Sequence, residues 1–174
     1  LPTWKKLMDC EGYPYEIIIP DDASADGSAD WIAQFHPEVK LIRADTNCGF
    51  SGNFNRGAQQ AKGSFILALN TDVEPLTGFL SPMLAHFKDS CVFAVGAQLK
   101  GYDHRVQDAG KWPDYHFFGI KSTRDFIPNP EIPVETWFCS AAFCIYDALK
   151  FRELDGFDEL FNPFYYEDAD LCFR

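Results

Sequence analysis

Short apolar runs alternate with amphipathic segments along the first half of this chain. Runs rich in β-branched and other apolar residues at 15–20, 39–43 and 65–69 predict strands, and polar turn formers follow each of them. The intervening segments 28–35 and about 52–61 predict helices. This order of strand, helix, strand, helix and strand is typical of an α/β fold with right-handed crossovers and a largely parallel sheet.

The pattern is less regular towards the carboxyl terminus. Residues 77–88 predict a further amphipathic helix, and residues 92–97 predict another strand. From 101 to 133 no period is visible, which predicts a long loop that is functional or mobile. The apolar run 134–146 predicts a strand, and an acidic helix is expected to start within 165–171.

The strand at 65–69 is followed at once by Asn70, Thr71 and Asp72. An unbroken apolar run predicts a strand buried on both faces of a sheet. Open α/β sheets bind ligands at the carboxyl ends of their strands. Asp72 is therefore predicted to offer a hard oxygen ligand to Mg²⁺ or Mn²⁺, with Asn70 beside it. A simple polar turn is the alternative, because these residues are common turn formers.

Two further polar groups are candidates for nucleotide binding. Asp21 ends the first predicted strand, where a carboxylate can accept hydrogen bonds from a base or a ribose. Helix capping is its alternative role. Asn47, Gly49 and Asn55 belong to a loop that enters a helix, and helix amino termini attract phosphate. A helix that is simply capped is the simpler explanation of that loop.

Glu167 and Asp168 start the last predicted helix. One of them is a candidate general base, although acidic residues are also favoured in a first turn by the helix dipole. The aromatic residues just before them are too apolar for a freely solvated surface: Phe161, Phe164, Tyr165 and Tyr166. They suggest a wall beside a sugar or a lid that packs on the core.

Composition narrows the class of protein. The chain has 174 residues, of which 47% are hydrophobic, so it is long enough for one globular domain with a core. Its net charge of -11 argues against nucleic-acid binding, and no apolar run is long enough to span a membrane. The six cysteines lack metal-ligand spacing and suggest reduced thiols of a cytoplasmic protein.

Three stretches together carry a family resemblance: residues 17–28 (IIIPDDASADGS), 39–72 (from VKLIR through NCGF to LNTD) and 156–174 (from GFDELF to YYEDADLCFR). In this order the chain resembles the family-two glycosyltransferases, in particular the bacterial rhamnosyltransferase-like members. The resemblance implies a GT-A type nucleotide-diphospho-sugar transferase fold, an α/β fold with a mostly parallel mixed sheet flanked by helices. It also implies one catalytic domain, 1–174, with a nucleotide-binding half, 1–100, and an acceptor-binding half, 101–174.

The implied activity is inverting transfer of a sugar from a UDP- or dTDP-linked donor to a hydroxyl of a glycan or a lipid-linked acceptor. Such chemistry serves bacterial polysaccharide or glycoconjugate synthesis, in the cytoplasm or at the inner face of the membrane. The first strand of the family is missing from this sequence, and the chain stops just after the acidic helix start, without the carboxyl-terminal region that many members carry. It is therefore expected to be truncated at both ends. Any membrane association is expected to involve parts outside this chain.

The resemblance also implies roles for individual residues. Asp72 would hold Mg²⁺ or Mn²⁺, Asp168 of the Glu167–Asp168 pair would be the catalytic base, and Trp137 would lie on the acceptor side. The expected nucleotide-binding residues are Asp21, Asn47, Gly49, Asn55 and Asn70.

Two other functions remain open from the sequence. A non-catalytic relative would bind a nucleotide or glycan, but it would be free to lose the acidic residues that are present here. A nucleotidyltransferase would use similar carboxylate and metal chemistry, and would be expected to carry a Gly-rich loop with a basic residue after its first strand.

Overall fold

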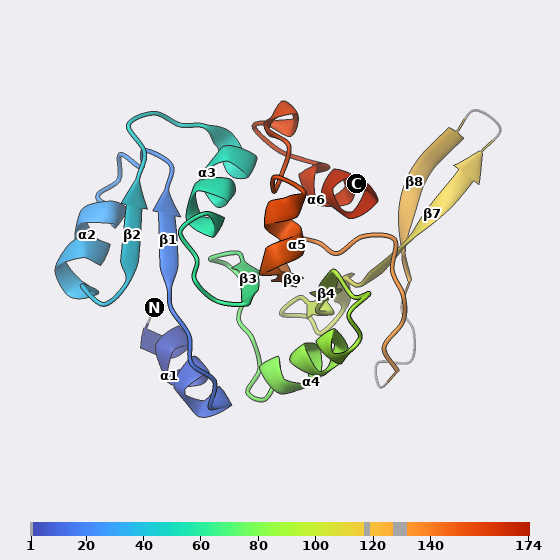
Figure 1. Ribbon diagram of the computed structural model, residues 1–174, viewed down its shortest axis with the longest axis horizontal. Helices are drawn as coiled ribbons and strands as arrows, with labels where there is room; N and C mark the ends of the chain where they lie inside the picture. Colours follow the sequence, from blue (N-terminus) through green and yellow to red (C-terminus); the bar gives the residue numbers. More distant parts are fainter. Residues whose placement is uncertain (1, 117–118, 127–131) are drawn as a thin grey trace.

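The computed structural model describes residues 2–116, 119–126 and 132–174 (Figure 1). The helices and strands of the first half alternate as the apolar pattern predicts. In chain order the elements are α1 (Pro2–Glu11), β1 (Ile18–Asp21), α2 (Ser28–Phe35), β2 (Lys40–Arg43), α3 (Gly49–Ala58), β3 (Phe65–Leu69), α4 (Leu80–Ala85), η1 (His86–Lys88), β4 (Ala94–Gly96), β5 (Leu99–Lys100), β6 (Val106–Asp108), β7 (Gly110–His116), β8 (Gly119–Phe126), β9 (Phe143–Asp147), α5 (Ala148–Glu153), η2 (Glu159–Phe161) and α6 (Glu167–Phe173).

The strands pair in both directions. β1 and β2 are parallel, with Ile18 opposite Lys40 and Asp21 opposite Arg43. β9 lies between β3 and β4 and is antiparallel to both. Among the described strands β1 and β2 form the only parallel pair, so the expectation of mostly parallel pairing is wrong. The reason is that a strand from the second half of the chain enters the sheet of the first half and runs against its neighbours.

The segment that was expected to be a long loop forms strands instead. β5 pairs with β6, and β7 pairs antiparallel with β8 from Gly110 opposite Phe126 to His116 opposite Gly119. The β7–β8 hairpin projects from the body of the molecule in Figure 1. Its strands are paired through main-chain hydrogen bonds, which require no apolar period in the sequence. Residues 117–118 and 127–131 of the expected loop lie outside the described part of the chain.

The expected strand at 134–146 is also wrong over most of its length. Only Phe143–Asp147 is a strand, and Trp137 lies in the irregular stretch before it. Thr136 holds that stretch, because its hydroxyl accepts a hydrogen bond from the Lys111 backbone nitrogen (2.7 Å) and donates to the Phe138 carbonyl oxygen (3.0 Å). Side-chain hydrogen bonds of this kind compete with a strand ladder.

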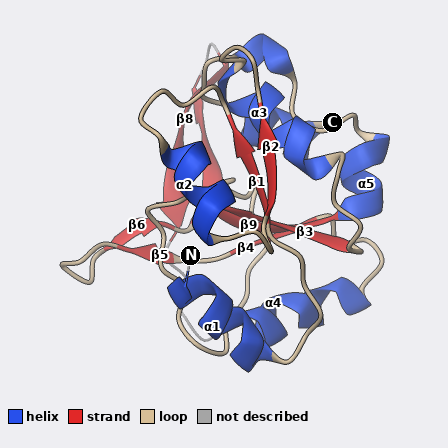
Figure 2. Cartoon of the chain, turned by 90° about the vertical axis from the view of Figure 1, so that its left-hand side faces the viewer, coloured by secondary structure: helices blue, strands red, loops and turns tan. Residues whose placement is uncertain are grey.

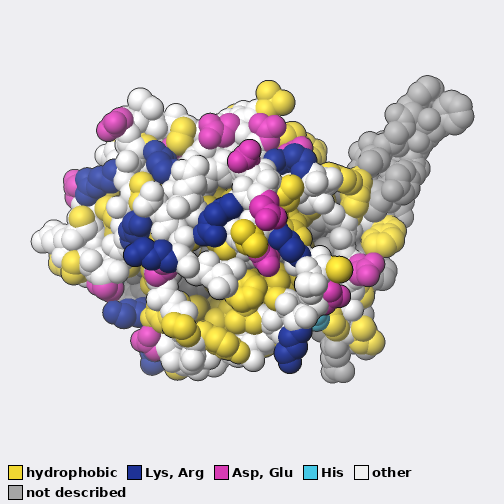
Figure 3. Space-filling view, viewed as in Figure 1, with side chains coloured by type: hydrophobic (Ala, Val, Ile, Leu, Met, Phe, Trp, Pro, Cys, Tyr) yellow, Lys and Arg dark blue, Asp and Glu magenta, His cyan; other side chains and the backbone are white. Residues whose placement is uncertain are grey.

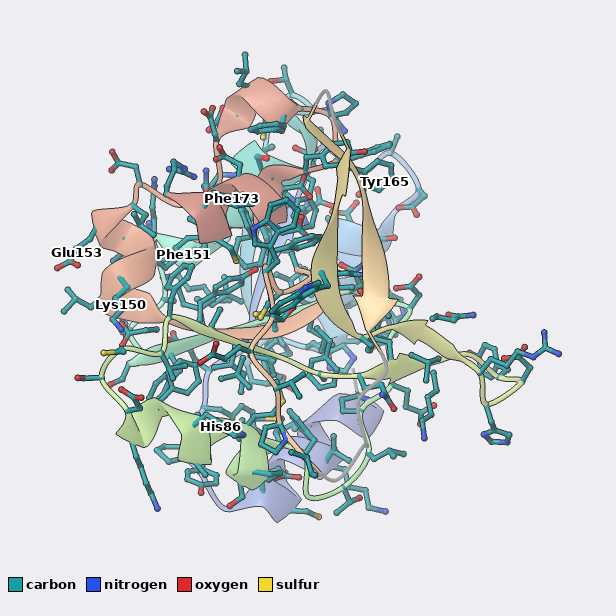
Figure 4. All side chains as sticks on the ribbon, turned by 90° about the vertical axis from the view of Figure 1, so that its right-hand side faces the viewer. His86, Lys150, Phe151, Glu153, Tyr165 and Phe173 are labelled. Atoms are coloured by element: carbon teal, nitrogen blue, oxygen red, sulfur yellow. The ribbon has the colours of Figure 1, made fainter. Side chains whose placement is uncertain are left out.

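Aromatic side chains fill the core between the central sheet and the helices of the carboxyl-terminal half. Tyr146 of β9, Phe151 of α5 and Phe157 are each at most 2% exposed, and their rings are in mutual contact. Phe54 of α3 joins them, with its ring centroid 5.0 Å from that of Phe157. Figure 4 shows Phe151 directed inward and Glu153, on the same helix, directed outward. The aromatic rings of this cluster thus join α3, α5 and the sheet.

The helices surround the strands on several sides. Figure 2 shows α2 beside the β1–β2 pair and α1 and α4 at the opposite end of the molecule from α3. On the face drawn in Figure 3, Lys and Arg side chains are scattered among acidic ones and form no continuous basic surface among the described residues. No helix in the described ranges has the length and apolar character needed to cross a bilayer.

Candidate functional site

Asp21 lies where β1 ends, as its sequence position predicts. Its backbone carbonyl accepts a hydrogen bond from the Ala44 nitrogen (2.9 Å), and its carboxylate accepts one from the Ser24 nitrogen (3.2 Å). A cleft of about 400 Å³ opens beside it, lined by the β1–α2 loop and by Arg43 at the end of β2. The backbone of α2 does not use Asp21 as a cap, since Gly27 occupies that position with φ 83°. Asp21 is therefore available to a ligand.

Asp22, which the sequence analysis overlooked, joins β1 to the start of α3. Its Oδ1 accepts hydrogen bonds from the backbone nitrogen of Cys48 (2.9 Å) and from its thiol (3.1 Å), and its Oδ2 accepts one from the Gly49 nitrogen (3.0 Å). Arg56 lies 3.6 Å from the carboxylate. Burial alone would raise the pKa of Asp22, but these hydrogen bonds and the guanidinium outweigh it, and the pKa is lowered.

The other loop residues have mainly structural contacts. The Asn47 side chain accepts a hydrogen bond from the Gly49 nitrogen (3.2 Å). Gly49 itself has φ +74° and begins α3, earlier than the sequence suggested. Asn55 binds both the nitrogen and the carbonyl oxygen of Phe157 (2.9 and 2.7 Å), and so closes a turn of the carboxyl-terminal half. Nucleotide contacts by Asn47, Gly49 and Asn55 stay predictions.

The turn after β3 presents Asp72 at the surface. The Val73 nitrogen donates to the Asn70 carbonyl (3.3 Å), which closes the turn and leaves Asp72 exposed. Within the described residues no hydrogen bond or ion pair engages the Asp72 carboxylate, and no group of three or more His, Cys, Asp or Glu side chains could hold a metal. One open carboxylate fits Mg²⁺ or Mn²⁺ that is shared with a diphosphate, because such ions often bind one or two protein carboxylates together with phosphate oxygens and water.

Glu167 and Asp168 begin α6, as predicted, and Glu167 is buried whereas Asp168 is partly buried. Glu167 is 6% exposed, and its Oε2 has no hydrogen-bond partner among the described residues. Asp168 accepts hydrogen bonds from the backbone nitrogens of Ala169 (2.7 Å) and Ala141 (3.3 Å). Burial raises the pKa of both carboxyl groups, and the nearby charge of Asp108 adds to the rise at Asp168. A raised pKa suits a group that must accept a proton.

Asp108 and Lys111 lie near this base candidate and were not anticipated. The Lys111 ammonium lies 2.6 Å from the Asp108 carboxylate, and both side chains are largely buried. The Lys111 carbonyl also accepts a hydrogen bond from the Trp137 nitrogen (3.0 Å). The Trp137 ring meets Phe173 of α6 edge to face, 4.5 Å between centroids. Trp137 therefore packs against the helix that carries Asp168, and its contact with an acceptor stays a prediction.

The aromatic residues just before α6 are open to solvent. Phe164, Tyr165 and Tyr166 are 57%, 71% and 72% exposed, unlike the aromatic core. The rings of Phe164 and Tyr165 contact each other, 4.8 Å between centroids. Figure 4 shows Tyr165 at the surface of the molecule, away from the core residue Phe151.

One short turn connects the metal candidate with the base candidate. The Asn70 nitrogen donates to the Ala142 carbonyl (3.0 Å), and the Ala141 nitrogen donates to the Asp168 carboxylate (3.3 Å). The turn after β3 and the start of α6, far apart in sequence, therefore both attach to Ala141 and Ala142. Asp22 could have been found from its place in an acidic doublet, whereas no sequence signal marks the Asp108–Lys111 pair.

Known proteins share both sequence and fold with this chain. The family model described as Glycosyl transferase family 2 matches residues 1–148, a range that ends before Glu167 and Asp168. A pre-mycofactocin glycosyltransferase of Mycobacterium tuberculosis is 26% identical over 159 residues, which cover 91% of this chain and 33% of that protein. The chain thus spans about a third of the length of this curated relative.

Two solved structures show the same fold at low identity. The S. aureus TarS 1-349 structure in complex with UDP has a TM-score of 0.65 and 18% identity, and the match covers 97% of this chain and 48% of that one. The mannosyltransferase PcManGT from Pyrobaculum calidifontis, in complex with GDP-Man and Mn²⁺, has a TM-score of 0.62 and 16% identity, over 98% and 47% of the two chains. The expected GT-A type fold is confirmed by these likenesses.

Proposed function

This chain belongs to glycosyl transferase family 2, and on that premise we propose that it forms the sugar-transfer site of an inverting, metal-dependent glycosyltransferase. The observation that carries the proposal is the attachment of the Asn70–Asp72 turn and of Asp168 to the same two residues, Ala141 and Ala142. A metal-binding acid and a separate acidic base are the two groups that single-displacement transfer requires.

The donor is a nucleoside diphosphate sugar, bound from the Asp21 side. The carboxylate of Asp21, which accepts a hydrogen bond from the Ser24 nitrogen, and the cleft beside it support a nucleoside contact there. The TarS structure contains UDP and the PcManGT structure contains GDP-Man, so both bases belong in the test together with dTDP. The division into two halves at residue 100 stays a prediction. β9, from the second half, lies between β3 and β4 of the first half.

Asp72 would hold the divalent ion, with the donor's phosphate oxygens as further ligands. When bound, Mg²⁺ or Mn²⁺ neutralises charge that develops on the leaving diphosphate. Asp168 takes the proton from the acceptor hydroxyl, and its raised pKa makes it a stronger base than an ordinary aspartate. Trp137, beside α6, and the exposed aromatic residues before α6 support a sugar-bearing acceptor on that side.

The proposed chemistry also suggests an acceptor and a cellular compartment. A glycan or a lipid-linked acceptor in polysaccharide or glycoconjugate synthesis fits the proposal, with transfer in the cytoplasm or at the inner membrane face. All six cysteines are free thiols, which supports a reducing compartment.

Calorimetric titration of UDP, dTDP and GDP, with and without Mn²⁺, tests the donor site. We expect metal-dependent binding of one nucleotide, weakened about tenfold or more by Asp72→Ala, or at least ~1.4 kcal/mol. Glu74→Ala is the matched control, because Glu74 is another exposed acid just after the same turn. The affinity of this variant for the nucleotide should stay within about twofold of that of the unchanged chain. Absence of Mn²⁺-dependent binding, or an unaffected Asp72→Ala, would refute the site. Cleavage between the phosphates of a nucleotide sugar would instead indicate nucleotidyl transfer.

A further inference from the structure

We propose that Asp22 is a positioning residue that fixes segment 162–168, and with it Asp168, against the donor side of the site. The role of Asp168 as base rests on the proposed function, but the contacts that place its segment do not. They run from β1 through the start of α3 to residues that lie more than a hundred positions further along the chain.

Asp22 holds the start of α3, because both of its carboxylate oxygens accept hydrogen bonds from residues there. Two backbone nitrogens and one thiol, from Cys48 and Gly49, point at its two oxygens at 2.9 to 3.1 Å. The side chain is only 19% exposed, and Arg56 at 3.6 Å adds a positive charge. Hydrogen bonds to an ionised and sheltered carboxylate are among the stronger ones in proteins. Asp22 therefore fixes the backbone at Cys48 and Gly49.

The backbone at Gly49 and Phe50 also contacts segment 162–168, called the base segment below because it leads to Asp168. A Cβ on Gly49 would lie 2.6 Å from the Asn162 Oδ1 and 2.8 Å from its Cγ, so Gly49 and Asn162 are in close contact. The Phe50 nitrogen donates to the Pro163 carbonyl at 3.0 Å. From Asn162 and Pro163 the chain reaches Asp168 within a few residues. A shift of Gly49 and Phe50 must therefore move or release this segment.

Asp21 is held by different contacts. β1 pairs with β2 up to Asp21, whose carbonyl oxygen binds the Ala44 nitrogen (2.9 Å) and whose carboxylate binds the Ser24 nitrogen (3.2 Å). None of these bonds involves Cys48 or Gly49. Loss of the Asp22 anchor should therefore release the base segment while the donor contact at Asp21 stays in place.

The test is hydrogen exchange by mass spectrometry on the chain and on Asp22→Asn. The amide that replaces one oxygen brings N–H groups towards the donors of Cys48 and Gly49, which leaves those donors unsatisfied. We expect exchange to accelerate by roughly tenfold or more in peptides covering 47–52 and 160–168, with β3 and β9 unchanged.

Asp26→Asn is the matched control. Asp26 lies in the same β1–α2 loop and accepts a backbone hydrogen bond from Ser28 (2.9 Å). Its carboxylate bonds within its own loop, whereas that of Asp22 bonds to Cys48 and Gly49 at the start of α3. Exchange in both peptides should be unaffected by this change. Acceleration confined to 47–52, or equal acceleration across the whole chain, would overturn the proposal, because neither shows a specific hold on the base segment.

Asn162→Ala tests the same junction if Asp22→Asn folds poorly. It removes the side chain next to Gly49 and leaves every Asp22 bond intact. We expect faster exchange in 160–168 while 47–52 stays protected. Unchanged exchange in 160–168 would also overturn the proposal. Failure of the unchanged chain to bind a nucleotide would count against the donor site alone, since the exchange results do not depend on a ligand.

Discussion

Two acidic doublets, Asp21–Asp22 after β1 and Glu167–Asp168 at the start of α6, have opposite surroundings. Around Asp22, burial is outweighed by hydrogen bonds from Cys48 and Gly49 and by Arg56, and the pKa is lowered. Around Glu167 and Asp168 burial dominates, and the pKa of each carboxyl group is raised. The two doublets look alike in sequence. Hydrogen-bond donors, burial and neighbouring charges, which the fold brings to each site, give Asp22 a lower affinity for protons and Glu167 and Asp168 a higher one.

This difference corresponds to two uses of a carboxylate. An ionised group with every oxygen bound, such as Asp22, works as an anchor for backbone. A shielded group with few donors, such as Asp168, binds a proton more readily and so can serve as a base. The comparison predicts that changes at the two doublets will alter different measured quantities.

The largest effect is expected from Asp168→Asn. Loss of a general base lowers the turnover number by about 10²- to 10⁴-fold, whereas the affinity for UDP should not change because the donor side is untouched. Release of the nucleoside diphosphate from sugar donors that carry the nucleotide identified by calorimetry checks this expectation. Glu167→Gln is the control and should retain turnover. If Glu167→Gln abolishes turnover and Asp168→Asn does not, the base is Glu167.

Removal of the packing beneath the second doublet should give the next largest effect. Leu171 is 0% exposed on α6 and belongs to the core cluster around Phe151 and Phe157. Leu171→Ala should lower the free energy of unfolding by about 2 to 5 kcal/mol, measured by urea denaturation. Leu160→Ala, at a position that is 84% exposed, should change it by about 0.5 kcal/mol or less. Equal effects of the two changes would show that α6 is not held by the core.

The pH dependence of turnover should follow the second doublet. Since the pKa of Asp168 is raised above 3.8, turnover should rise with pH through an acid limb that lies above the usual aspartate range, up to about tenfold for each pH unit. A pH profile of kcat/KM measures that limb. A limb at the ordinary aspartate value would contradict a shielded base, and Asp108→Asn should move the limb to lower pH because it removes the neighbouring charge.

The strands and helices of the first half could be predicted from the sequence because their apolar residues follow the spacing of a strand or a helix. β3 and α2 match their predicted ranges. The β7–β8 hairpin could not be predicted, since pairing of its main chain requires no apolar pattern in the sequence. The insertion of β9 between β3 and β4 could not be predicted either. The sequence predicted Asp21, Glu167 and Asp168 as site residues, whereas Asp22 was overlooked. It did not reveal that the pKa of Asp22 is lowered while the pKa values of Glu167 and Asp168 are raised. The donors of Asp22 come from Cys48 and Gly49, which lie far from it in the sequence.

The smallest effect, and the most direct test of the comparison, is that of Glu167→Gln on stability. The pKa of Glu167 in the folded chain is raised above 4.5, so the folded state binds more protons than the unfolded state between these two values. Glu167 therefore contributes to the free energy of unfolding below its pKa in the unfolded state, and this contribution is lost as pH rises through its pKa in the folded state. At pH 7 the neutral glutamine should stabilise the chain by on the order of 1 kcal/mol, or roughly 2 to 4 °C in Tm, and this gain should vanish in acid. Glu153→Gln, at an exposed site on α5, should show no such pH dependence in thermal melts. A Glu167→Gln chain that is less stable than the unchanged one at pH 7 would mean that the carboxylate is held by donors after all, and the contrast between the two doublets would be lost.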